Sequence, residues 1–124
     1  MPLIIKAMKN EGIKRIITIG TAGILQSRIA LNFLRYQSSE SRQKSTRAAK
    51  EHHKVYEMLK QSFLDWTIVC PTYLPEGERI GKYRIQRDCL PEGGVKISVW
   101  DTAEFTFKQI RKSDYIKERV GIAY

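Results

Sequence analysis

Two short apolar runs with a helical segment between them constrain the fold of this chain more than any other feature. The first run, Arg15–Gly20, is rich in β-branched residues and ends at a glycine, and the second, Asp65–Cys70, ends before Pro71. Both are typical of strands that are buried on two faces. Because parallel strands need a crossover connection, the two runs and the helix between them predict an α/β fold with a parallel sheet.

The crossover helix is expected to begin at about Thr46. Its apolar positions recur at steps of three or four residues, which places them on one face of the helix. These positions are Ala48, His52, Val55, Leu59 and Phe63. We expect Phe63, at the end of this stripe, and Trp66, in the second strand, to anchor the core between helix and strand.

Shorter patterns complete the expected order of elements. A helix is expected over Pro2–Glu11, because proline suits a first helical turn and Gly12 can end the helix. The apolar stripe of this helix consists of Leu3, Ile4, Ala7 and Met8. Asp101 is expected to cap a later helix, with Glu104 in the capping-box position. Three further strands are expected at Tyr83–Arg87, Val95–Val99 and Val120–Tyr124.

The length and the cysteine content limit the classes of protein to which this chain can belong. A chain of 124 residues is expected to form one domain over 1–124, since two domains would each lack a sufficient core. No apolar run approaches the roughly 20 residues that span a bilayer, and no signal peptide is visible. We therefore expect a cytoplasmic protein without a membrane partner, in which Cys70 and Cys89 are free thiols.

The charge is strongly basic. Lys and Arg outnumber Asp and Glu by 22 to 13, which gives a net charge of +9 and favours anionic partners in general. One basic run is a candidate binding surface for phosphate or nucleic acid. It consists of Arg35, Arg42, Lys44, Arg47, Lys50 and Lys54. Such runs are more often a solvated surface, and no RNA-binding motif or zinc-finger spacing accompanies this one. Nucleic acid is therefore not the partner we expect.

The segment after the first strand is the first candidate site, because parallel α/β sheets bind ligands beyond the carboxyl ends of their strands. It reads Gly20, Thr21, Ala22 and Gly23. Small residues let a ligand approach the backbone, and the Thr21 hydroxyl can donate to a carbonyl or carboxamide. The alternative is a simple tight exit from a strand. The phosphate-binding G-x-G-x-x-G and G-x-x-x-x-G-K-[ST] motifs are absent.

Two other segments are candidates. Pro71 turns the chain after the second strand, so the backbone of Thr72 and Tyr73 can face a ligand, unless this too is a plain strand exit. His52, on the apolar face of its helix, suits proton transfer, and the alternative is a satisfied, partly buried histidine. No metal site is expected, because His52 and His53 point about 100° apart on a helix and no further ligands complete a set.

Four stretches together resemble one known family. They are RIITIGTAG, EHHKVYEMLKQSFLDWTIVCPTYL, GKYRI and ISVWDTAEF. They are similar to the C-terminal half of the atypical short-chain dehydrogenase/reductases, in particular the NAD(P)H-binding group that includes flavin reductase/biliverdin-IXβ reductase and the NmrA-like proteins. The most specific piece is LKQSFLDWTIVCP, which resembles the family's L..SGLDWTIVRP, and Ile97–Phe105 is the next. The resemblance implies a doubly wound, Rossmann-like fold and NAD(P)H as cofactor.

The resemblance also implies roles for individual residues. Thr21 matches the family's Ser/Thr near the nicotinamide and the substrate carbonyl. The usual catalytic Tyr and Lys positions fall on Ala48 and His52, and flavin/biliverdin-type reductases also have a histidine at the second position. Thr21 and His52 are therefore the expected catalytic residues, on one side of the sheet. The expected cofactor-binding residues are Gly20, Thr21, Ala22, Pro71, Thr72 and Tyr73. The implied substrates are small carbonyl compounds, flavins or quinones.

The chain departs from the family by lacking its glycine-rich loop, its adenine-ribose site and three parallel strands. We therefore expect a partial Rossmann-like domain, a truncated or split form that binds dinucleotide weakly or not at all and has little activity alone. The resemblance makes the strand at Arg15–Gly20 central, so its edge would be open and a homodimer, or a multiple of it, is expected. Two alternative functions are a non-catalytic α/β module that assembles with itself or another chain, and a basic nucleic-acid-binding protein.

Overall fold

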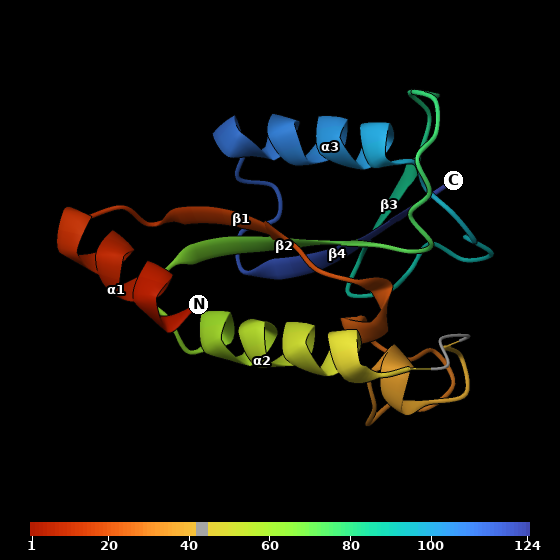
Figure 1. The fold of residues 1–124 in the computed structure, drawn as a ribbon, viewed down its shortest axis with the longest axis horizontal. Helices are drawn as coiled ribbons and strands as arrows, with labels where there is room; N and C mark the ends of the chain where they lie inside the picture. Colours follow the sequence, from red (N-terminus) through yellow and green to blue (C-terminus); the bar gives the residue numbers. More distant parts are fainter. Residues whose placement is uncertain (42–44) are drawn as a thin grey trace.

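A mixed sheet of four strands organises the part of the chain that the structure describes (Figure 1). The computed structural model describes residues 1–41 and 45–124. The strands lie in the order β1 (Arg15–Ile19), β2 (Asp65–Pro71), β4 (Glu118–Ala123) and β3 (Arg84–Arg87). β1 and β4 are both parallel to β2, and β3 pairs with β4 in the antiparallel sense. The expected α/β fold with parallel strands is confirmed.

Helices cover both faces of the sheet. α1 (Pro2–Glu11) and α2 (Arg47–Lys60) lie on one side, and α3 (Val99–Lys108) lies on the other (Figure 1). Among the described residues, three short 3₁₀ turns complete the elements, namely η1 (Ala22–Ile24), η2 (Arg35–Gln37) and η3 (Gln109–Arg111). No helix in the described part of the chain has the length and apolar character needed to cross a bilayer.

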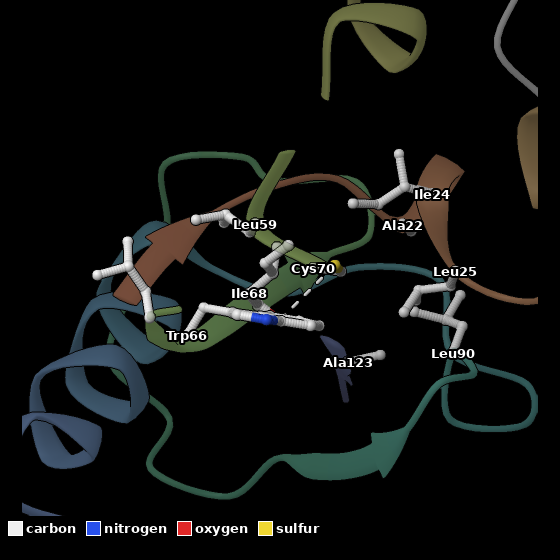
Figure 2. Close-up of a cluster of buried hydrophobic side chains, with 10 residues drawn as sticks. Ala22, Ile24, Leu25, Leu59, Trp66, Ile68, Cys70, Leu90 and Ala123 are labelled. Atoms are coloured by element: carbon white, nitrogen blue, oxygen red, sulfur yellow. Dashed lines mark hydrogen bonds between the residues drawn. The ribbon is translucent and has the colours of Figure 1, made fainter. Parts of the chain in front are cut away.

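The core is built on the alternating side chains of β2. Trp66, Ile68 and Cys70 point into the cluster beneath α2, which Figure 2 shows together with side chains from η1 and β4. Val69 points to the opposite cluster, which Phe105 of α3 covers. β2 is therefore buried on both faces, as its continuous apolar run predicts.

The expected core anchor at Phe63 is wrong, whereas the one at Trp66 is confirmed. Phe63 is 38% exposed, while its neighbour Leu64 is fully buried. The reason is that α2 ends at Lys60, and the Ser62 hydroxyl donates to the carbonyl of Leu59 in the turn that follows. The helical spacing that selected Phe63 therefore does not continue to it.

The helix over Pro2–Glu11 has the expected bounds but not the expected stripe. Ile5 and Met8 pack against the core, whereas Leu3 is 82% and Ile4 50% exposed. Gly12 ends the helix with a left-handed φ of 68°, which a glycine adopts at no steric cost.

The expected strand at Val95–Val99 does not form. In the described residues Lys96 forms an isolated bridge to Tyr73, its carbonyl accepts from the Tyr124 N–H at 3.0 Å, and Val99 already begins α3. Asp101 is not the cap of that helix, because Ser98 holds the position and its hydroxyl accepts from the Asp101 N–H at 3.1 Å. The last strand is present as β4, and the strand expected at Tyr83–Arg87 is present as β3.

Candidate functional site

The carboxyl ends of β1 and β2 lie side by side. The backbone N–H of Gly20 donates to the carbonyl of Val69 at 2.7 Å, so the ladder continues to the point where the chain leaves β1. Thr21 follows in an extended conformation and is half-buried, and η1 begins immediately after it. The structure thus brings both sequence-predicted segments to one edge of the sheet.

The two glycines of the first segment are in close contact with the protein itself. A Cβ on Gly20 would lie 2.9 Å from Cγ2 of the buried Ile68. A Cβ on Gly23 would lie 3.2 Å from Cβ of Ala49 and 3.6 Å from Cγ2 of Thr21. The small size of these residues therefore lets the turn after β1 pack against β2 and the first turn of α2. The turn η1 and α2 therefore lie on the same side of the sheet (Figure 1).

Cys70 lies beneath this turn but is not a nucleophile. Burial raises the pKa of its thiol to about 12, although the positive charge of Arg119 and a backbone hydrogen bond from Thr21 act in the opposite direction. Since the thiolate is the reactive form, the thiol is inert near neutral pH.

The segment after β2 is partly engaged by its own chain. Pro71 is buried and still pairs with Ile122, so β2 is one residue longer than expected. The Tyr73 carbonyl accepts from the Ile97 N–H at 3.0 Å, and the Thr72 hydroxyl donates to the Val95 carbonyl at 3.5 Å. The Tyr73 side chain is 67% exposed at this edge.

The two adjacent histidines have different surroundings. His53 Nδ1 is hydrogen-bonded to Tyr36 Oη at 2.7 Å, and its Nε2 lies 3.6 Å from a carboxylate oxygen of Glu57. His52 is half-buried and has no polar partner among the described residues. His53 is thus held in a Tyr–His–Glu arrangement, which sequence reasoning missed because no periodicity links Tyr36 to α2.

Tyr36 also lies close to Gly23, two residues after Thr21. The position of a Cβ on Gly23 is 3.4 Å from Tyr36 Cβ as well as 3.6 Å from Thr21 Cγ2. The long excursion between β1 and α2 therefore returns a tyrosine to the strand exit. Its hydroxyl is hydrogen-bonded to His53, which fixes the orientation of the ring.

A buried carboxylate holds the loop that follows β2. Asp101 is fully buried and accepts from the backbone N–H groups of Ile80 and Gly81 at 3.1 and 2.9 Å, and from the Tyr124 hydroxyl. Burial alone would raise the pKa of this carboxyl, but the hydrogen bonds from Tyr124, Gly81, Ile80 and Ser98 lower it below its usual value. The charged form of Asp101 therefore ties the loop to the start of α3.

The basic run is partly neutralised by neighbouring acids. Arg35 pairs with Glu40 at 3.4 Å, and Lys54 pairs with Glu51 at 3.1 Å. Two members of the run, Arg42 and Lys44, lie outside the described residues. No group of His, Cys, Asp and Glu side chains suited to hold a metal ion occurs within 1–41 and 45–124.

Comparisons with known proteins agree with this geometry. A family model described as NAD(P)H-binding matches residues 1–113. None of the curated proteins matches the sequence.

Solved structures share the fold. A proposed exported protein from Burkholderia pseudomallei is 25% identical with a TM-score of 0.81, and the match covers 98% of this chain and 60% of the other. A proposed epimerase from Bacteroides thetaiotaomicron is 27% identical with a TM-score of 0.81, covering 98% and 58%. A proposed NADH-flavin reductase from Streptococcus pneumoniae is 24% identical with a TM-score of 0.78, covering 98% and 64%.

This chain therefore spans about three fifths of the length of these similar structures. The family match extends over most of the sequence, and the parallel strands meet at an edge of the kind where Rossmann-like sheets bind ligands. The chain belongs to the NAD(P)H-binding family, and its sheet is Rossmann-like.

Proposed function

We propose that this chain provides the nicotinamide side of an NAD(P)H-dependent oxidoreductase. The observation that carries the proposal is the Gly20–Val69 hydrogen bond, which sets the exits of β1 and β2 next to each other. Thr21 follows Gly20, and Pro71, Thr72 and Tyr73 follow Cys70, so both segments belong to the edge at which parallel sheets bind ligands.

The described residues fit only one end of a dinucleotide. β1 leads into η1 and a long excursion instead of a glycine-rich turn that opens a helix, so this strand exit offers no cradle for a pyrophosphate. Gly20, Thr21 and Ala22 on one strand exit, with Pro71, Thr72 and Tyr73 on the other, would hold the nicotinamide end. When bound, the cofactor supplies a hydride to the substrate.

The residues of the chain would bind the substrate and move a proton. The Thr21 hydroxyl donates a hydrogen bond to a substrate carbonyl, and His52 supplies a proton to it. The half-buried His52 has no polar partner in the described part of the chain and is available to a ligand, whereas His53 is held by Tyr36 and Glu57. A small carbonyl compound, a flavin or a quinone fits this chemistry.

We also propose a cytoplasmic location, which the free Cys70 and Cys89 thiols support.

The experiment that tests this site uses the reduced nicotinamide mononucleotide, which is the cofactor without its adenosine half. We expect a Kd in the millimolar range, which corresponds to a binding free energy of about −4 kcal/mol. In ¹H–¹⁵N NMR spectra the backbone signals expected to shift are those of Gly20, Thr21, Ala22 and Thr72. Adenosine monophosphate is the matched probe and is expected to leave these signals unchanged. Thr21→Ala is expected to weaken binding, while Thr106→Ala on the opposite side of the sheet is not. Shifts confined to other residues would contradict the proposal.

A second experiment separates the two histidines. His52→Gln is expected to leave the free energy of unfolding unchanged, because His52 has no polar partner among the described residues. His53→Gln is expected to lower it, because the hydrogen bond to Tyr36 is lost. Titration with single-stranded oligonucleotide at two salt concentrations tests the alternative of nucleic-acid binding, since such binding weakens steeply with salt.

A further inference from the structure

Thr21 occupies the N-cap position of η1, but its hydroxyl does not cap the turn and stays available to a ligand. The backbone around this residue is held instead. The Thr21 carbonyl accepts from the Ile24 N–H at 3.1 Å, and the N–H of the preceding Gly20 donates to the Val69 carbonyl. The direction in which Thr21 presents its hydroxyl therefore depends on where η1 holds the Thr21 carbonyl.

The turn η1 needs support from outside itself. A 3₁₀ turn of three residues closes few hydrogen bonds, and the carbonyls at its end have no donor within the turn. The Ala22 carbonyl is bonded to the Leu25 N–H at 3.0 Å, whereas the Ile24 carbonyl lies beyond this last bond. Its donor is Nη1 of Arg119, which is 95 residues further along the chain and lies 2.6 Å away. The support of η1 thus comes from β4.

The Arg119 guanidinium is suited to this task because it is itself fixed. It is buried, its Nε donates to a carboxylate oxygen of Asp88 at 3.2 Å, and it lies 4.8 Å from the ring centre of Tyr56. A planar guanidinium that is held by an ion pair and by an aromatic ring has little freedom to turn. The hydrogen bond to the Ile24 carbonyl therefore starts from a fixed point.

The turn after β3 holds the same segment at a second point. The Asp88 carbonyl accepts from the Gln26 N–H at 2.7 Å, and the Asp88 N–H donates to the Arg119 carbonyl at 2.9 Å. Asp88 adopts a left-handed φ of 60°, a conformation in which aspartate is enriched among the residues other than glycine. One residue thus orients the Arg119 side chain and also bonds the backbone two residues after Ile24.

We propose, on the basis of the nicotinamide site proposed above, that Arg119 is the positioning residue for Thr21 at that site. The guanidinium is buried, so it acts through the Ile24 carbonyl and does not itself contact the ligand. The requirement is geometric, because a hydroxyl that donates to a ligand must be held within about 0.5 Å of its productive position. Loss of the Arg119 hydrogen bond frees η1 and lets Thr21 leave that position.

The first test compares how folded variants bind reduced nicotinamide mononucleotide. Arg119→Met removes the donor and is expected to raise the Kd by about fivefold or more. Phe105→Ala is the matched control, because it lowers stability by emptying a buried position in the cluster on the other face of the sheet. It is expected to leave the Kd unchanged. An unchanged Kd in Arg119→Met, or equal weakening by both variants, would overturn the proposal.

Arg119→Lys provides the measurement if Arg119→Met does not fold, and circular dichroism verifies the folding of each variant. Lysine keeps the charge that pairs with Asp88 but lacks the planar fork that reaches the Ile24 carbonyl at the same time. We expect a Kd about twofold or more above that of the wild type. A wild-type Kd in this variant would contradict the role of the fixed guanidinium and overturn the proposal.

The second test is hydrogen exchange, which needs no ligand. The Ile24 and Leu25 amides are expected to exchange at least about tenfold faster in Arg119→Met than in Phe105→Ala, whereas β2 amides, which report global unfolding, exchange faster in both. Amides of η1 that keep their protection in Arg119→Met would overturn the proposal. A wild-type chain that does not bind the mononucleotide would instead contradict the proposed function, and the exchange data would still show whether Arg119 holds η1.

Discussion

Arg119 donates a hydrogen bond of 2.6 Å from Nη1 to the carbonyl oxygen of Ile24, so β4 directly holds the turn that follows Thr21. The same guanidinium pairs with Asp88 at 3.2 Å and lies 4.8 Å from the ring centre of Tyr56 on α2. One buried cation therefore joins the last strand, the crossover helix and the strand exit of the candidate site.

Replacement of this cation is expected to loosen the site. Arg119→Met leaves the Ile24 carbonyl without its donor, and we expect a loss of about 3 kcal/mol in the free energy of unfolding. Arg87→Met is the matched control, because the Arg87–Glu118 ion pair is largely exposed and should contribute less than about 1 kcal/mol. Urea unfolding of both variants measures the difference. Equal losses would mean that Arg119 does not hold η1.

Leu64, and not Phe63, should carry the packing at the end of α2. Leu64→Ala is expected to cost about 2–5 kcal/mol, since it empties a fully buried position. Phe63→Ala should cost less than about 1.5 kcal/mol, because the ring is 38% exposed. Denaturant unfolding of the two alanine variants compares adjacent positions directly, and a larger loss at Phe63 would contradict the assignment.

Asp101 should make stability depend on acid pH. Its pKa is lowered in the folded protein, so its charged form stabilises the fold above the unfolded pKa of about 3.9, and that contribution is lost as the pH falls toward the folded value. Asp101→Asn should therefore be less stable than wild type near neutral pH, with the gap narrowing below about pH 4. Glu78→Gln, at an exposed position, is the control. A gap that stays constant with pH would argue against a charged Asp101.

The chain alone should show little reductase activity. Hydride transfer needs a firmly held cofactor, and the exit of β1 provides no pyrophosphate-binding helix terminus. Purified protein mixed with NADPH and a flavin or quinone is expected to show oxidation no faster than the uncatalysed mixture. Steady NADPH oxidation that Thr21→Ala abolishes would show this expectation to be wrong.

Several features of the fold could be read from local patterns. The runs at β1 and β2 identify strands because β-branched residues suit a pleated backbone, and the helix between them fits parallel pairing. Burial on both faces was predicted correctly for β2 but not for β1. Gly12 marks the end of α1 because a glycine adopts the left-handed conformation freely. The two strand exits could be named as candidate sites because the carboxyl ends of parallel strands lie at the same edge of the sheet.

Other features depended on contacts between residues far apart in the sequence. Helical spacing placed Ala48 on the apolar face, whereas Ala48 is exposed and Ala49 packs near Gly23. Neighbouring side chains on a helix differ by about 100°, so which of them meets the loop before α2 depends on how that loop packs.

The sequence by itself determined the strands β1 and β2, their parallel pairing and the edge of the sheet that carries the candidate site, because those follow from local propensity and chain connectivity. Only the tertiary structure decided that Tyr36 meets His53, that Asp101 holds the loop after β2, and that Arg119 reaches Ile24. Each of these contacts satisfies a polar group at a place set by the packing of several elements, and no short stretch of sequence contains both partners.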